Sequence, residues 1–321
     1  MNRRTRQSGF ALLMAMVLVF IAGVAMAGLA RRSAAGAVES LSAVQDLQRR
    51  WAVASCRATL LDRAEVILDR AERDIEVDAQ DRKNADEPVI IQPVASLRLV
   101  CQLAGTDYEL VLVDEQSKVN VNRLLSQSGR SKAQAAVRLL SSRSNHRDGG
   151  AGSVMLRPLP ARPELQSASL AMSALATYSQ LFSDVQPRQL AGTNGEPGMA
   201  AEVTCWGNGK VHVRRASDAV IELACGGALE PQLIRSLIAL RKEHPDRDLA
   251  GLLSDLEQVD EKKKAKIPDL LTDSSGCHAL WVIAHGRQRS WFTLAVGVGN
   301  GGSPAGESKV QRVPVRYDFT W

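Results

Sequence analysis

The stretch RRTRQSGFALLMAMVLVFIAGVAMAGLA, residues 3–30, joins a short basic leader to a long apolar segment. The 20 residues from Phe10 to Leu29 carry no charge, and as a helix they would be roughly 30 Å long, which is the thickness of the hydrocarbon layer of a bilayer. Three arginines precede this segment, and Arg31 and Arg32 end it. Because Lys and Arg favour the cytoplasmic side, we expect one membrane-spanning helix with a cytoplasmic N-terminus.

The residues leave three interpretations of this N-terminus open. Ala25-Met26-Ala27 is an A-x-A pattern that supports a cleaved secretory signal, although the apolar segment is longer than the usual core of about 7–15 residues. A plain signal anchor would not be cleaved. The third interpretation is the prepilin type. The basic leader, Gly9 directly before Phe10 and the long apolar helix resemble a type IV prepilin signal, in which a dedicated peptidase cuts between Gly9 and Phe10 and the helix is kept.

Composition narrows the classes of protein. A chain of 321 residues with 45% hydrophobic residues can bury a core and form two subdomains. Part of the net charge of +5 comes from Arg3, Arg4 and Arg6, so we expect no nucleic-acid partner. The five cysteines show no C-x-x-C spacing, which argues against a zinc cluster. Cys205 and Cys225 are the first candidates for a disulfide.

After the apolar segment, helical periodicity continues over 38–75 and predicts an amphipathic stalk, interrupted near Gly36. The polar segment 78–88 predicts a loop. The runs 96–104 and 107–116 are rich in Val and Leu, with apolar and polar residues in alternation, and they predict a β-hairpin.

The end of this hairpin carries the segment VDEQSKVNVNRLL, residues 113–125. Its asparagines alternate with valines, so we expect the asparagines to bond the backbone at a strand-to-helix turn and the valines to enter the core. We interpret the segment as a feature of the fold with no catalytic role. Its candidate residues are Asp114, Glu115, Lys118, Asn120 and Asn122.

The second half of the chain mixes helices and loops before it returns to strands. We expect helices over 131–142, 164–183, 230–244 and 248–259, loops over 144–163 and 191–202, and strands over 278–286, 289–299 and 310–321. The run Gly209-Lys210-Val211-His212-Val213 repeats the earlier pattern, with His212 in the place of an asparagine. Ser217 is expected to cap the helix that follows.

No motif in the sequence indicates an enzyme. G-x-S-x-G, H-E-x-x-H and the P-loop pattern are absent, and the five histidines are scattered. The run GVGNGG (297–302) leads into another expected strand and not into a helix, so it is not a dinucleotide site. We therefore expect no catalytic residues, no cofactor and no metal.

Taken in order, these features resemble the protein K family of the type II secretion system, whose members are minor pseudopilins. The family carries a D-E-x-G-K-[IL]-N-[IL]-N stretch, and this chain has Ser117 in the place of the glycine. Prepilins usually carry Glu at the fifth residue after the cut, where this chain has Met14. The absence of Glu at this position is typical of the protein K family.

The resemblance implies a pilin-like α+β fold, in which a long N-terminal helix packs on an antiparallel sheet with an inserted helical subdomain. The implied parts are a leader (1–9), a membrane helix (10–30), a periplasmic stalk (31–77), a first part of the sheet (89–122), an insert (123–270) and closing strands (271–321).

The resemblance also implies a function. The chain would be cut and methylated by prepilin peptidase, would sit in the bacterial inner membrane, and would join minor pseudopilins I and J at the fibre tip to start assembly for protein export. The alternatives are a minor pilin of a type IV pilus or DNA-uptake machine, and a secreted or signal-anchored periplasmic protein.

Overall fold

The computed structural model describes residues 4–81, 93–103, 105–143, 153–158, 175–192, 196–256, 260–286, 290–298 and 315–320. The chain divides into two compact units, Met1–Ala54 and Ser55–Trp321, which we describe in turn.

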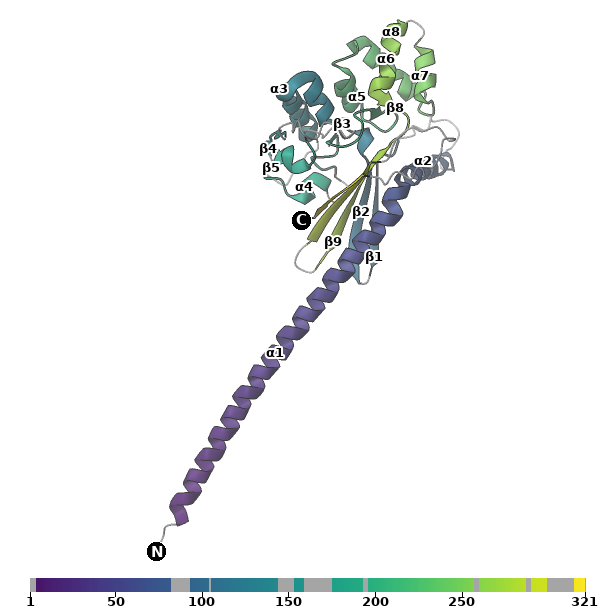
Figure 1. Cartoon of the computed structure of the whole chain (residues 1–321). Helices are drawn as coiled ribbons and strands as arrows, with labels where there is room; N and C mark the ends of the chain where they lie inside the picture. Colours follow the sequence, from purple (N-terminus) through teal and green to yellow (C-terminus); the bar gives the residue numbers. More distant parts are fainter. Residues whose placement is uncertain are drawn as a thin grey trace. The chain divides into compact units, whose positions relative to one another are not determined.

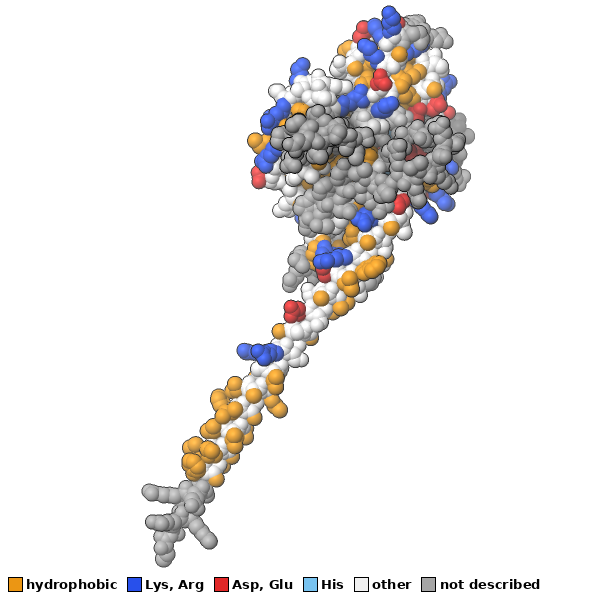
Figure 2. Space-filling model, viewed as in Figure 1, with side chains coloured by type: hydrophobic (Ala, Val, Ile, Leu, Met, Phe, Trp, Pro, Cys, Tyr) orange, Lys and Arg blue, Asp and Glu red, His pale blue; other side chains and the backbone are white. Residues whose placement is uncertain are grey.

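The first unit is helical throughout its described part. Helix α1 (Arg4–Leu60) begins in this unit (Figure 1). Its apolar side chains from Phe10 onward are exposed, as Figure 2 shows. This stretch is long and apolar enough to cross a membrane and is compatible with a single-pass anchor. The expected interruption near Gly36 is wrong, because α1 is continuous there. A single glycine costs a helix only about 1 kcal/mol, and Ala35 and Ala37 flank this one.

The second unit begins with the last turn of α1, a 3₁₀ turn η1 (Leu61–Arg63) and helix α2 (Ala64–Asp81). One stripe of these helices is buried, at Cys56, Leu61, Ala64, Leu68 and Glu72. α2 runs through the first part of the loop predicted over 78–88, whose residues after Asp81 lie outside the described part.

A five-stranded antiparallel sheet forms the centre of this unit, in the order β1-β2-β9-β10-β11. The predicted hairpin and the three predicted C-terminal strands are confirmed. Gly105 makes the hairpin turn with φ +75°, a conformation that favours glycine. The strands are β1 (Ser96–Leu103), β2 (Thr106–Asp114), β9 (Cys277–His285), β10 (Ser290–Val298) and β11 (Val315–Thr320).

Each face of the sheet has its own covering. On the helix face, η1 contacts β9 and β10, and α2 contacts β1 and β2. A Cβ at Gly297 would lie only 3.1 Å from Leu61 Cγ, so glycine permits this close approach. On the opposite face, Trp281 and Val111 join the core of the segment between β2 and β9, and the Trp281 ring stacks on Tyr178 with centroids 6.2 Å apart. The layout is the α+β, pilin-like one expected from the sequence.

The segment between β2 and β9 is inserted between two neighbouring strands of the sheet. It opens with η2 (Glu115–Ser117), β3 (Val119–Asn120) and helix α3 (Val121–Arg143), which is kinked at Gly129. Its small parallel sheets pair β3 with β6 and β7 with β8. The remaining elements are β4 (Ser153–Val154), η4 (Tyr178–Gln180), β5 (Phe182–Ser183), α4 (Pro187–Ala191), β6 (Val203–Thr204), β7 (Val211–His212), α5 (Asp218–Cys225), α6 (Pro231–Glu243), α7 (Leu249–Asp255), α8 (Glu261–Lys264), α9 (Ile267–Leu270) and β8 (Leu271–Thr272).

Two sequence predictions for this segment need correction. The helix expected over 164–183 is wrong in its described part, because 175–183 holds η4 and β5, and residues 164–174 lie outside the described part. The apolar residues there reach the core from an irregular segment. The expected Cys205–Cys225 disulfide is not present in this structure, in which all five cysteines are free thiols, and Cys205 Sγ donates to the Thr177 carbonyl at 3.7 Å. The helix predicted over 230–244 is present as α6, and the one predicted over 248–259 is present as the shorter α7, which ends at Asp255.

Candidate functional site

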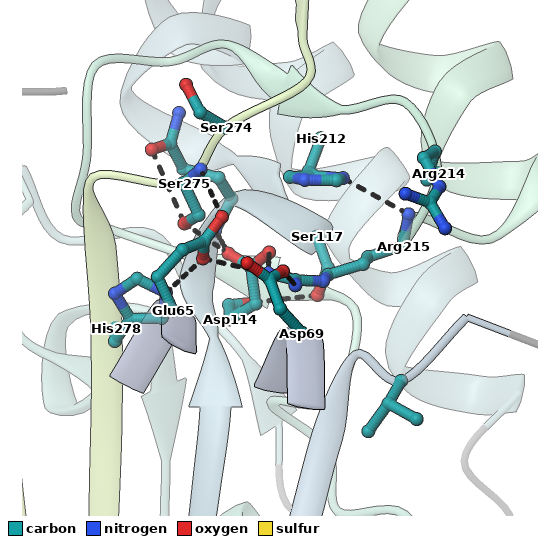
Figure 3. A network of polar contacts seen from close by, with 12 residues as sticks. Glu65, Asp69, Asp114, Ser117, His212, Arg214, Arg215, Ser274, Ser275 and His278 are labelled. Atoms are coloured by element: carbon teal, nitrogen blue, oxygen red, sulfur yellow. Dashed lines mark hydrogen bonds and ion pairs between the residues drawn. The ribbon is translucent and has the colours of Figure 1, made fainter. Parts of the chain in front are cut away.

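The most densely connected polar cluster of the second unit surrounds Arg215, between β7 and α5 (Figure 3). Its side chain is 1% exposed, yet it contacts four carboxylates. Nε donates to Glu72 Oε1 at 2.8 Å, and Nη1 lies 2.9 Å from Glu65 Oε2 and 3.3 Å from Asp114 Oδ2. Nη2 donates to Asp69 Oδ1. We call these five residues the Arg215 cluster.

The fold explains how this cluster assembles. Glu65, Asp69 and Glu72 follow at i, i+4 and i+7 in α2, so they lie on one face of the helix. Asp114 ends β2, and Arg215 comes from the inserted segment. One guanidinium therefore joins the helix, the sheet and the insert. Burial disfavours its charge, but the hydrogen bond with Glu72 and the charges of the other carboxylates outweigh burial and raise the pKa of Arg215.

A second layer of contacts holds the carboxylates in place. His278 Nε2 of β9 lies 2.9 Å from Glu65 Oε2. Ser275 Oγ donates to Asp114 Oδ1 at 2.5 Å, and the Gln116 backbone N–H donates to the same oxygen at 2.8 Å. Burial alone would raise the pKa of Glu65, but the hydrogen bond from His278 and the charge of Arg215 lower it to about 2.

The two repeated sequence motifs form the same kind of strand-to-helix turn. Asn120 Oδ1 accepts the backbone N–H of Arg123 at 3.1 Å, and His212 Nδ1 accepts the backbone N–H of Arg215 at 3.3 Å. Each motif supplies a two-residue strand of a parallel pair. Burial lowers the pKa of His212, which favours the neutral ring that can accept this bond. The imidazole thus replaces the amide and also positions Arg215.

The first motif sends its two acids to different partners. Asp114 contacts the Arg215 cluster, whereas Glu115 Oε1 accepts from Lys118 Nζ at 2.6 Å. The Glu115 and Lys118 side chains are 0% and 2% exposed. The Tyr178 hydroxyl lies 3.4 Å from both the Lys118 Nζ and the Glu115 Oε2 atoms. Glu115 and Lys118 thus form a fully buried ion pair at the start of the segment between β2 and β9.

The asparagines of the motif bond the backbone, as expected, and Val119 and Val121 are buried. Asn120 Nδ2 donates to the Trp206 carbonyl at 2.8 Å. Asn122 Nδ2 donates to the carbonyls of Leu175 and Cys205 at 2.7 and 2.8 Å, and its Oδ1 accepts the Leu175 N–H at 2.8 Å. The bonds of Asn120 and Asn122 to the carbonyls of Trp206 and Cys205 hold the β6–β7 loop against the start of α3.

The expected Ser217 cap is also present, with Ser217 Oγ accepting the Val220 N–H at 3.3 Å.

The candidate residues of the N-terminus lie in the first unit. Gly9 lies in α1, but its surroundings are outside the described part. Phe10 and Met14 are exposed on α1. Sequence reasoning missed Arg215, Glu65 and Asp69 as a cluster. Two sequence features could have indicated the cluster. They are the acids at i, i+4 and i+7 in the predicted stalk and the arginine that follows the second motif.

Chemically, the Arg215 cluster is suited to holding three parts of the fold together. One buried guanidinium contacts all four of its carboxylates. Among the described residues, no group of three or more His, Cys, Asp or Glu side chains is placed to hold a metal ion.

Comparisons with known proteins give little further information. No family model matches the chain, and no curated protein matches it. One solved structure with a similar chain is described as "The Crystal Structure of the GspK-GspI-GspJ complex from enterotoxigenic Escherichia coli Type 2 Secretion System". The identity is 15% and the TM-score 0.42, over 82% of this chain and 95% of that one. The likeness is weak.

Proposed function

We propose that this chain is a minor pseudopilin at the tip of a type II secretion pseudopilus, with a mechanical and not a catalytic role. The observation that carries the proposal is the uncharged segment that begins with Phe10 directly after Gly9 and continues as one helix to Leu60. An antiparallel sheet with a segment inserted between neighbouring strands follows it in the chain.

In this proposal, prepilin peptidase cuts between Gly9 and Phe10 on the cytoplasmic side and methylates the new N-terminus. The helix Phe10–Leu29 then holds the protein in the inner membrane, with residues 31–77 as the periplasmic stalk. The sheet parts 89–122 and 271–321 and the insert 123–270 form the periplasmic head.

Met14 supports the position at the tip. A carboxylate at membrane depth costs roughly 2.5–3.5 kcal/mol on insertion scales, and in a fibre it can be offset by the N-terminal ammonium of a neighbouring subunit. A subunit at the tip has no further subunit to neutralise, so it can carry methionine there. The proposed partners below it are minor pseudopilins I and J of the same system.

The Arg215 cluster supports a mechanical role for the head. Force applied to the stalk reaches α2, and the cluster ties α2 to β2 and to the insert through buried charges. A head joined in this way would move as one body when the fibre extends.

Co-purification tests the proposed partners. The full chain with a C-terminal tag is expressed with pseudopilins I and J of its own system and extracted in detergent. We expect both partners to be retained, and secretion to be restored in a strain that lacks this chain. Met14→Glu should reduce secretion, whereas Met16→Leu, on the same exposed helix, should not. Retention of neither partner, together with restored DNA uptake or pilus formation, would favour a minor pilin instead.

A further inference from the structure

Cys101 of β1 lies on the helix face of the sheet. His278 defines that face, because it contacts Glu65 of α2, and its register partner on β2 is Asp114. Alternation along β2 places Tyr108 on the same face as Asp114, and Tyr108 is the register partner of Cys101. The Cys101 side chain is partly exposed.

Cys56 belongs to the helical stripe that covers this same face. It is 7% exposed and begins the buried stripe that continues with Leu61, Ala64 and Leu68. Leu61 approaches the sheet so closely that a Cβ at Gly297 would lie 3.1 Å from its Cγ. Burial raises the pKa of Cys56, and the nearby Cys101 thiol raises it further, so the two sulfur groups are close enough to interact.

The other three cysteines differ in their surroundings. Cys205, Cys225 and Cys277 are at most 1% exposed and lie in the core of the insert and its face of the sheet. Burial raises the pKa of each, most strongly for Cys277 and Cys205. Buried thiols of this kind are inert toward oxidants.

We propose that Cys56 and Cys101 form a disulfide that fastens the last turn of α1 to the edge strand β1. The proposal rests on the proposed function in one respect, which is that the head faces an oxidising compartment. A disulfide-bearing oxidant is required. The Cys101 thiolate attacks the oxidant's disulfide and releases one of its thiols, and the Cys56 thiolate then displaces the second. The two cysteines lose two electrons and two protons, and the oxidant gains both.

Such a bond would reinforce the junction that carries load in a fibre. It closes a chain loop from residue 56 to residue 101, and cross-linking a loop restricts the unfolded chain. The bond would keep the stalk attached to the edge of the sheet when the stalk is pulled.

Peptide mapping tests the proposal directly. The full chain is purified from exporting cells after thiols have been blocked by alkylation, and is digested with trypsin without reduction. The two cysteines fall in separate tryptic peptides, 51–57 and 99–118. In parallel, the reduced, folded protein in detergent is exposed to oxidised glutathione. We expect the two peptides to be linked in both samples, and Cys101→Ser to leave Cys56 alkylated.

The outcomes are distinguishable. If both thiols stay free with oxidised glutathione, or if Cys56 pairs elsewhere, the disulfide proposal is wrong whatever the location of the protein. If the link forms in the purified protein but not in cells, the pairing is supported and the proposed periplasmic location is contradicted. A higher thermal unfolding midpoint without reductant, absent in Cys101→Ser, would show that the bond stabilises the head.

Discussion

Arg215 Nε and Glu72 Oε1 lie 2.8 Å apart although 143 residues separate them in the chain. Both side chains are almost fully buried. Through this contact the helix that continues the stalk is bound to the insert, and Asp114 adds the sheet to the same cluster.

Removing the guanidinium should destabilise the head strongly. Arg215→Met removes the buried cation that contacts Glu72 and Asp114, and breaking a buried ion pair in this way costs about 3–5 kcal/mol. Arg235→Met is the control, because Arg235 is exposed and, among the described residues, donates only to the Pro231 carbonyl of its own helix. Chemical denaturation of the detergent-purified protein measures both. Equal stability of the two variants would show that the Arg215 cluster contributes little.

The Arg215 cluster should make the free energy of unfolding depend on pH in the acidic range. The pKa of Glu65 is about 2 in the folded protein, against an ordinary value of 4.5, so the unfolded chain binds a proton more readily between these values. The stabilisation from this group is therefore complete above about pH 5 and is lost as the pH falls toward 2, with an upper bound on the order of 3 kcal/mol. Glu65→Gln should flatten the loss of unfolding free energy between pH 6 and pH 3, whereas the exposed Glu222→Gln should retain it. Parallel curves for all three proteins would contradict the assignment.

Asn122 should be irreplaceable even by its closest isostere. Its amide donates to two carbonyls and accepts one N–H, and Asn122→Ala leaves backbone groups unsatisfied at about 1–3 kcal/mol each. Asn122→Asp should also lose stability, since a carboxylate cannot donate to carbonyls. Gln127→Ala, exposed on the same helix, is the control. Wild-type stability of Asn122→Asp would mean that the two donated bonds are unimportant.

In the buried Lys118–Glu115 pair, a second substitution should recover part of the stability lost by the first. Lys118→Met leaves Glu115 charged and unpaired in the core, which we expect to cost about 3–5 kcal/mol. Adding Glu115→Gln removes that charge and should recover part of the loss. A double-mutant cycle measures this coupling, and strict additivity of the two changes would contradict it.

Local sequence signals predicted the parts of the fold that depend on neighbours in the chain. Alternating runs rich in Val and Leu predicted the hairpin of β1 and β2, and the alternation of asparagine with valine predicted which side chains bond the backbone at the start of α3. In both cases the periodicity alone decides which face a residue occupies.

Long-range pairing accounts for what the sequence did not predict. Glu72 has the appearance of a solvated residue on the polar side of an amphipathic stalk, yet it is 5% exposed because a distant arginine neutralises it. Nothing near residue 72 indicates that partner. The helix prediction over 175–183 was wrong for a related reason. The spacing of apolar residues that is typical of a helix also occurs in an irregular segment whose side chains pack in the core.

The identity of the mature N-terminus tests the central claim most directly. The chain is recovered from cells with and without prepilin peptidase, and its first residue and mass are determined for the wild type, for Gly9→Val and for Ala27→Leu, which removes the A-x-A pattern. We predict a methylated start at Phe10 that requires the peptidase, is lost in Gly9→Val and is unchanged in Ala27→Leu. A start at Gly28, or an intact Met1 in both strains, would contradict the pseudopilin account and make the chain a secreted or simply anchored protein.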